Sequence, residues 1–105
     1  MEWTTKTGPF GGTWYEGYVD GYFVYARVFE EPSRFGINDG RMTALVIAPH
    51  KAPVLDARVN YDCGWVEGLP AARYRPIVEQ VFADIHDRPI DWAYEERKHR
   101  VGMGF

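Results

Sequence analysis

The sequence predicts an α+β domain in which a four-stranded antiparallel β-meander carries one C-terminal helix on one face. The first observation is a series of four runs with the composition of strands, all of which precede the first stretch of helical periodicity. The second is that this stretch has a single apolar stripe, so the helix has one face to bury against the sheet. The chain has 105 residues and a hydrophobic content of 46%, which fits a single domain over residues 1–105.

The first two predicted strands, residues 13–19 and 22–30, form a hairpin. Asp20-Gly21 between them favours a type I′ turn, because aspartate and glycine accept the positive φ that this turn requires. The turn places Val19 opposite Tyr22 and makes one face of the hairpin small and aliphatic. The opposite face is aromatic. Its residues are Trp14, Tyr18, Phe23 and Tyr25.

The aromatic face is a candidate contact surface. If the aliphatic face packs on the helix, the aromatic side chains point away from the core, and an exposed apolar patch of this kind marks an interaction site. A homodimer or another contact would then cover the patch. The alternative is that the chain covers it with its own N-terminal arm, residues 1–12, or with its C-terminal tail, residues 95–105. The sequence leaves both alternatives open.

The remaining elements follow in order along the chain. Residues 42–48 form an apolar run that predicts the third strand, and residues 54–61 alternate between apolar and polar side chains, which predicts a half-buried fourth strand. Pro76 is expected in the first turn of the helix, where its missing N–H costs nothing. Residues 90–94 are compatible with a short fifth strand. The stripe that predicts the helix consists of Tyr74, Ile77, Val78, Val81, Phe82 and Ile85.

Two polar, glycine-containing blocks, residues 32–41 and 60–65, lie at the ends of predicted strands. In an up-and-down meander the end of the second strand and the end of the fourth lie at the same edge of the sheet, so the two blocks are predicted to be neighbours. Residues that bind a ligand, or residues that stabilise the loops themselves, are therefore expected to be concentrated there. The candidate ligand-binding or partner-binding residues in the blocks are Arg34, Phe35, Asn38, Arg41, Asp62 and Trp65.

These residues have two interpretations. In a binding pocket, Arg34 and Arg41 would hold a phosphate while Phe35 and Trp65 stack on a base. In a structural clasp, Arg41 would pair with Asp62, side-chain turns would form around the first block, and Trp65 would anchor the loop to the core. The clasp is favoured because small domains commonly need such ties. Any ligand contact would then be made by Arg34, Phe35 and Trp65 around it.

Composition and motifs exclude several classes of function. The net charge of -3 argues against a polycation that wraps duplex DNA. The single cysteine, Cys63, excludes an internal disulfide and a zinc site built from cysteines. No apolar run approaches the roughly 20 residues of a membrane span, and no signal peptide is evident, so we expect a cytoplasmic protein without a membrane partner. Phosphate-binding glycine loops, paired-histidine metal motifs and nucleophile elbows are absent, so we expect no enzyme, no cofactor and no metal.

At the two blocks the chain resembles a family of small uncharacterised proteins from bacteriophages and prophages, classed as a domain of unknown function. The family pattern runs through Ser-x-x-Gly-Ile and Gly-Arg to Asn-Tyr-Asp-Arg-Gly-Trp, and the resemblance covers roughly residues 14–85. Cys63 stands where the pattern has arginine, and Ala44 stands where it usually has lysine. The matching residues are Phe23, Ala26, Val28, Ser33, Gly36, Ile37, Gly40, Arg41, Asn60, Tyr61, Asp62, Gly64 and Trp65.

The resemblance implies a phage accessory protein and does not imply a reaction. The first hypothesis is a non-enzymatic counter-defence binder that inhibits a bacterial immune protein such as a CRISPR effector, by association with other small phage proteins. The second is a sponge that sequesters a nucleotide immune signal, and incubation with cyclic dinucleotides would separate the two. Weaker alternatives are a small hydrolase that uses Asp62 or Asp39 and a purely structural phage protein.

Overall fold

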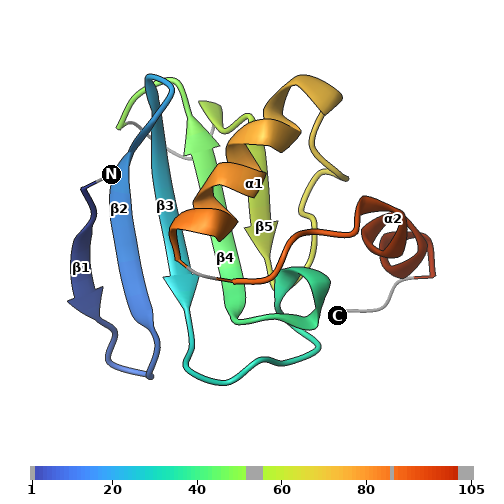
Figure 1. Ribbon diagram of the computed structural model, residues 1–105, viewed down its shortest axis with the longest axis horizontal. Helices are drawn as coiled ribbons and strands as arrows, with labels where there is room; N and C mark the ends of the chain where they lie inside the picture. Colours follow the sequence, from blue (N-terminus) through green and yellow to red (C-terminus); the bar gives the residue numbers. More distant parts are fainter. Residues whose placement is uncertain (1, 52–55, 86, 102–105) are drawn as a thin grey trace.

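The computed structural model describes residues 2–51, 56–85 and 87–101, which form an α+β domain. Five antiparallel strands lie in the order β1-β2-β3-β4-β5, so the sheet is a meander (Figure 1). One helix, α1, crosses one face of the sheet, and a second, α2, lies beyond the β5 edge. The strands are β1 (Thr4–Thr7), β2 (Thr13–Val19), β3 (Tyr22–Val28), β4 (Met42–Ala48) and β5 (Val59–Asp62), the helices are α1 (Arg75–Asp84) and α2 (Trp92–Arg100), and the short 3-10 turns are η1 (Ile37–Asp39) and η3 (Ala72–Tyr74).

The predicted hairpin is confirmed, including its register. Asp20 has a φ of 50° and Gly21 a φ of 80°, which is the pair of positive values that a type I′ turn requires. Val19 pairs with Tyr22 and Thr13 with Val28, as the turn predicts. The hairpin therefore separates its aliphatic and aromatic side chains onto opposite faces of the sheet.

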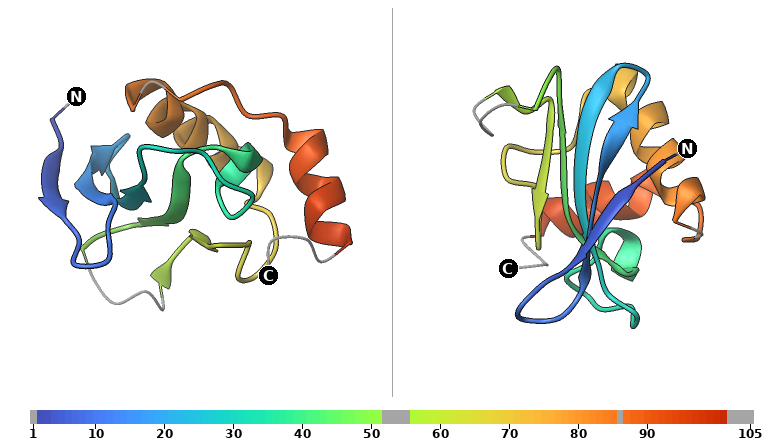
Figure 2. Two further views of the ribbon diagram at one scale, coloured as in Figure 1. Left: turned by 90° about the horizontal axis from the view of Figure 1, so that it is seen from below. Right: turned by 90° about the vertical axis from the view of Figure 1, so that its left-hand side faces the viewer.

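The core lies between α1 and the aliphatic face of the sheet. All six residues of the predicted helical stripe are buried, and Pro76 lies in the first turn of α1. They pack with inward-facing strand residues such as Val24, Leu45 and Ile47, each of which is fully buried. Burial of this apolar area is the main term that holds the two layers together. The two layers of Figure 2 correspond to this arrangement.

The N-terminal arm differs from the prediction, because it contains a strand. Residues Thr4–Thr7 form β1, which pairs antiparallel with β2 and extends the sheet to five strands. No pattern in the sequence predicts this strand, since every side chain in Thr-Thr-Lys-Thr is exposed and the run has no apolar alternation. The chain reverses between β1 and β2 through Gly11 and Gly12, which have φ values of 90° and 79°.

The C-terminal segment differs most from the prediction. The short strand expected at residues 90–94 and the start of the tail expected at residues 95–105 are wrong, since Trp92–Arg100 form the helix α2. Asp91 caps this helix by accepting a hydrogen bond from the Tyr94 backbone N–H. The alternation of Ile90, Trp92 and Tyr94 imitates a strand, and the residues that α2 buries deepest are charged, so no apolar stripe announces it. Residues 102–105 lie outside the described residues.

The fourth predicted strand, residues 54–61, is confirmed only from Val59 onward. β5 covers Val59–Asp62, with Val59 and Tyr61 buried. Residues 56–58 are not in a strand, and residues 54 and 55 lie outside the described residues. Within the described ranges, no helix is both long enough and apolar enough to cross a bilayer.

Candidate functional site

The two polar blocks are neighbours, as the meander topology predicts. The Tyr61 hydroxyl donates to the backbone carbonyl of Phe35 at 2.8 Å and so joins the second block to the first. Burial, together with the nearby carboxylate of Glu95, holds the pKa of Tyr61 well above its ordinary value. The hydroxyl therefore stays protonated and acts as a permanent donor between the blocks.

Glu95 from α2 ties the two blocks together a second time. Its Oε2 accepts hydrogen bonds from the backbone N–H of Asn38 at 2.8 Å and from Asn38 Nδ2 at 3.1 Å. Its Oε1 accepts from Trp65 Nε1 at 2.9 Å. The residue is only 1% exposed, so this carboxylate is a buried anion with three donors around it. Charge-assisted bonds of this kind are stronger than neutral ones and offset the loss of hydration.

Lys98 lies one turn later on α2, and its hydrogen bonds all go to residues of the first block. Its Nζ donates to the carbonyl of Arg34 at 2.6 Å, to the carbonyl of Gly36 at 3.2 Å and to Asp39 Oδ1 at 2.8 Å. An ammonium group has three protons, so all of its donors are used. The side chain is 5% exposed, and its charge is neutralised by Asp39. Glu95 and Lys98 together make α2 a polar latch, a name we keep for these two residues and their partners.

The turn held by the polar latch has an unusual backbone. Asn38 and Asp39 have φ values of 57° and 53°, in the left-handed region that asparagine and aspartate tolerate better than most residues. Gly36 is needed for a different reason, because a Cβ there would lie 2.1 Å from the carbonyl oxygen of Gly40. The Asn38 side chain also accepts from the backbone N–H of Asp91 at 2.7 Å, which connects the turn to the cap of α2.

Asp39 is held in its charged form. Partial burial by itself would raise the pKa of Asp39, but hydrogen bonds from Lys98 and Tyr94 and the charges of Lys98 and Arg88 outweigh it, so the pKa lies below its ordinary value. A carboxylate fixed in this way has lost the proton and the freedom that general acid catalysis would need. Both of its oxygens are already engaged, Oδ1 by Lys98 and Oδ2 by Tyr94.

The predicted ion pair between Arg41 and Asp62 is wrong. The Arg41 guanidinium donates instead to the carbonyl of Ile85 at the end of α1, at 2.7 Å, and its backbone N–H donates to Asp87. Asp62 is exposed and lies opposite Ala44 in the β4–β5 ladder. The β4–β5 register explains the difference, because Asp62 pairs with Ala44 in that ladder and therefore falls three positions from Arg41.

The six predicted site residues therefore divide into two groups. Asn38, Arg41 and Trp65 are occupied by contacts inside the molecule, which fits a clasp although its partners differ from those expected. Arg34, Phe35 and Asp62 are exposed, and the Arg34 guanidinium lies over the Phe35 ring at 4.9 Å. The region where residues 32–41 and 60–65 meet, which we call the block edge, thus offers few free groups to a ligand.

The open face of the sheet, on the side away from α1, carries the predicted aromatic residues. Trp14 stacks on Tyr25 with ring centroids 4.5 Å apart, and Tyr18 meets Phe23 edge to face. Phe23 is buried among these neighbours, whereas Tyr18 is 56% exposed. Of the N-terminal segment, Trp3 packs on Tyr15 on the α1 side, whereas Gly8 lies beside the Trp14 ring at the margin of the open face. The helix α2 contacts the two blocks.

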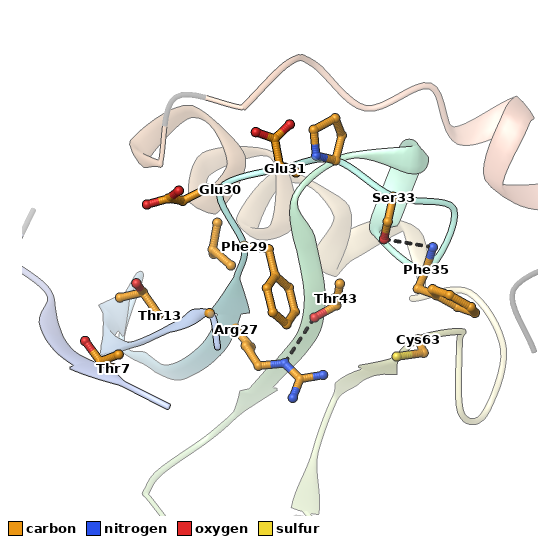
Figure 3. A pocket seen from close by; sticks show the side chains of 13 residues that line it. Thr7, Thr13, Arg27, Phe29, Glu30, Glu31, Ser33, Phe35, Thr43 and Cys63 are labelled. Carbon is orange, nitrogen blue, oxygen red and sulfur yellow. Dashed lines mark hydrogen bonds between the residues drawn. The ribbon is translucent and has the colours of Figure 1, made fainter. Parts of the chain in front are cut away.

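Arg27 lies on the open face near the C-terminal end of β3, and it is not among the candidate site residues predicted from the sequence. Its Nε donates to Thr43 Oγ1 at 3.1 Å, and its guanidinium lies over the rings of Trp14 and Phe29, at 5.4 Å and 5.2 Å. Two hollows of about 760 Å³ and 540 Å³ meet at this side chain. Figure 3 shows the larger hollow, with Phe29, Phe35 and Cys63 around Arg27. The cross-strand pairing of Arg27 with Trp14 was the signal available in the sequence.

No three His, Cys, Asp or Glu side chains in residues 2–51, 56–85 and 87–101 are grouped so that they could hold a metal ion.

Comparison with known proteins gives a family assignment. The family model described as a domain of unknown function, DUF7678, matches residues 13–86, which is more than half of the chain. The chain belongs to this family.

The DUF7678 match agrees with the sequence resemblance to a domain of unknown function over residues 14–85. It includes β2 to α1, both polar blocks and Arg27, whereas β1 and α2 lie outside the matched residues. No curated protein and no solved structure matches the chain. The polar latch therefore joins a helix outside the DUF7678 match to two loops inside it.

Proposed function

We propose that this protein is a non-enzymatic binding protein that uses the open face of its sheet to contact a partner protein. The observation that carries the proposal is the aromatic patch of Trp14, Tyr18 and Tyr25 on the face opposite α1, in which Tyr18 is exposed and the stacked Trp14 and Tyr25 are half-buried. Tyrosine, tryptophan and arginine are the residue types most enriched among the contacts that dominate protein interfaces. A rigid sheet presents them without a loss of backbone entropy on binding.

The class of partner follows from the family resemblance. A phage accessory protein that acts in the host cytoplasm would meet the host's immune proteins, so we take a bacterial defence protein, for example a CRISPR effector, as the first partner to test. Inhibition would then result from occupation of the partner's working surface. A second copy of this chain on the same face is the competing occupant, and the experiment below distinguishes the two.

The nucleotide sponge is the second candidate and has less support. Of the four residues predicted to hold the nucleotide, Trp65 is 3% exposed and its N–H donates to Glu95, while the Arg41 guanidinium donates to Ile85. Only Arg34 and Phe35 remain accessible, and Arg34 is not among the residues that line the hollow beside Phe35. A flat aromatic face is a better match to a protein than to a small nucleotide.

The test is a comparison of two variants with the natural chain. Trp14→Ala combined with Tyr25→Ala removes the stacked pair, and Phe10→Ala removes an aromatic ring that is 92% exposed and not part of the patch. We expect the double variant to lose the partner in pull-downs from a bacterium that carries the defence system, and Phe10→Ala to retain it. Light scattering on the same samples reports whether the natural chain is a dimer that the double variant dissociates.

A cellular assay tests the inhibitory role itself. Expression of the natural chain should raise phage plating efficiency by at least about tenfold in cells that carry the targeted defence system, and the double variant should not. Equal protection by the double variant would contradict the proposed surface. Unchanged pull-down and light scattering would also contradict it, provided that circular dichroism shows the double variant to be folded.

A further inference from the structure

The larger hollow beside Arg27 has the size of a site for a small molecule. Its volume of about 760 Å³ falls within the range of roughly 300 to 1,000 Å³ that ligand pockets occupy. It opens where the β1–β2 turn, the segment after β3, the bulged start of β4 and the residue after β5 come together (Figure 3). Segments far apart in the sequence thus contribute to one concave surface.

Arg27 presents a charged group to this hollow. The bond from Nε to the buried Thr43 hydroxyl fixes the plane of the guanidinium, and the rings of Trp14 and Phe29 flank it. Among the described residues no carboxylate pairs with Arg27, and its terminal N–H groups donate to no protein acceptor. A fork of this kind matches the two oxygens of a carboxylate.

The walls of the hollow suit a flat apolar group. Phe29 and Phe35 line it with Val28, and Ser33 and Cys63 lie between them. Gly12 keeps the opening clear, because a Cβ there would lie 3.2 Å from both the Arg27 Cγ and a carbon of the Phe29 ring. The hydroxyl of Ser33 accepts from the Phe35 N–H at 3.2 Å, so its own proton remains free for a ligand oxygen.

The charge around the hollow restricts the ligand further. Glu30 and Glu31 are exposed and line the same hollow as Arg27, so its formal charge is about -1 when the two carboxylates are ionised. A ligand with several negative charges would pair with one cation and be repelled by two anions. Among anions, a ligand with one negative charge gains the contact with the Arg27 fork and meets the least repulsion from the two carboxylates.

We propose that this hollow binds a small aromatic monocarboxylate, with the carboxylate on the Arg27 fork and the ring between Phe29 and Phe35. The site adjoins the proposed partner surface, because Trp14 flanks the Arg27 guanidinium, but neither Trp14, Tyr18 nor Tyr25 is among the residues that line the hollow. It also differs from a nucleotide sponge, because the acidic rim disfavours phosphates that carry two charges. The proposal therefore stands or falls independently of the proposed function.

The chain contains its own reporter for this site. Cys63 is the single cysteine, is partly exposed and lines the hollow, so a ligand held there should shield its thiol. The probe is 2-naphthoate at pH 7, with its uncharged amide, 2-naphthamide, as a control of the same shape. We expect saturable NMR shifts at the Arg27 Nε–H, at least about fivefold slower reaction of Cys63 with a thiol reagent at saturation, and at least about tenfold weaker binding of the amide, since it cannot form the charge-assisted pair.

Substitution separates the fork from the charge. Arg27→Lys keeps the charge and loses the planar fork, so we expect about tenfold weaker binding, whereas Arg73→Lys on the exposed η3 turn should leave binding unchanged. Equal binding of the acid and its amide, a comparison made on the natural chain, would overturn the proposal even if Arg27→Lys failed to fold. Binding without protection of Cys63, tighter binding of adenosine monophosphate than of 2-naphthoate, or no saturation at millimolar concentration would also overturn it.

Discussion

The block edge and the open face of the sheet carry the same kinds of residues, yet they differ in what those residues contact. At the block edge, Asn38 and Trp65 donate to Glu95, and the carbonyls of the first block accept from Lys98. On the open face, Arg27 has one side-chain hydrogen bond, to Thr43, and its guanidinium lies over the ring of Trp14, which stacks on Tyr25. Both regions would be described from composition as polar and aromatic candidate sites.

The difference shows how to separate construction from binding in a small domain. A polar group that the chain itself satisfies in a buried position contributes to the fold, because breaking its contact leaves an unpaired partner behind. A polar group that is fixed in orientation but lacks an acceptor is available to a ligand. Exposure and remaining hydrogen-bond capacity, more than residue type, therefore distinguish the two regions.

The strongest test of this comparison is Glu95→Ala. The change leaves Trp65 Nε1 and the Asn38 backbone N–H without their acceptor, so we expect a loss of about 3 kcal/mol in the free energy of unfolding. Urea denaturation followed by tryptophan fluorescence measures it. Glu96→Ala is the matched control, since that neighbouring side chain is about half exposed and makes one long ion pair, at 3.6 Å, with Arg75. Similar losses in the two variants would contradict a structural block edge.

Lys98→Met tests the other half of the polar latch. Methionine preserves much of the apolar stem but cannot donate to the two carbonyls or to Asp39, so we expect a loss of about 2 kcal/mol. Hydrogen exchange should become faster for the Asp39 and Gly40 N–H groups, which the η1 turn protects. A free energy of unfolding equal to that of the natural chain would mean that the Lys98 contacts between α2 and the first block do not stabilise the fold.

Substitutions of Arg41 and Asp62 test the comparison through a change of intermediate size in the free energy of unfolding. Arg41→Ala removes the bond to the Ile85 carbonyl and should cost about 1 kcal/mol, whereas Asp62→Ala should change stability by less than about 0.5 kcal/mol. The two effects should add in the double variant, because the side chains have separate surroundings. A coupling energy of about 1 kcal/mol or more, measured in the same denaturation series, would restore the ion pair that the structure replaces.

Acid stability gives the smallest expected effect. The pKa of Asp39 in the folded protein lies below its ordinary value of 3.8, so the charged form stabilises the fold above that pH. This contribution is lost as the pH falls through the lower, folded value. The difference in Tm between the natural chain and Asp39→Asn should therefore shrink between pH 7 and pH 3. Asp62→Asn is the control, and a constant difference for Asp39→Asn would show that its carboxylate does not take part in the acid response.

The sequence was sufficient where the local signal and the tertiary contact agree. Asp20-Gly21 requires a tight turn, which sets the β2–β3 register, and the apolar stripe of α1 has one face that can be buried. The neighbourhood of the two blocks follows from meander topology alone. Each of these predictions depends on a strong local pattern or on a rule of chain connection.

The sequence was insufficient where a contact is long-range and charged. Glu95 and Lys98 resemble residues of a solvated tail, and only the distant Asn38, Trp65 and Asp39 explain their burial. The predicted partner of Arg41 was wrong for a related reason, since the β4–β5 register places Asp62 opposite Ala44 and the guanidinium donates to the distant Ile85 carbonyl. Periodicity contains no information about such partners, because a single buried charge has no period.

The polar latch also determines the order in which this protein can be completed. Glu95 follows Trp65 by 30 positions, so at a synthesis rate of about 5 to 20 residues per second it is made roughly 2 to 6 s later. During that interval the residues of the sheet strands and of both blocks have been synthesised, but the acceptor that Asn38 and Trp65 share in the folded protein has not. Maturation of the edge is thus a late step in biosynthesis, and a ribosome stalled before residue 95 would present a nascent chain with an unfinished edge.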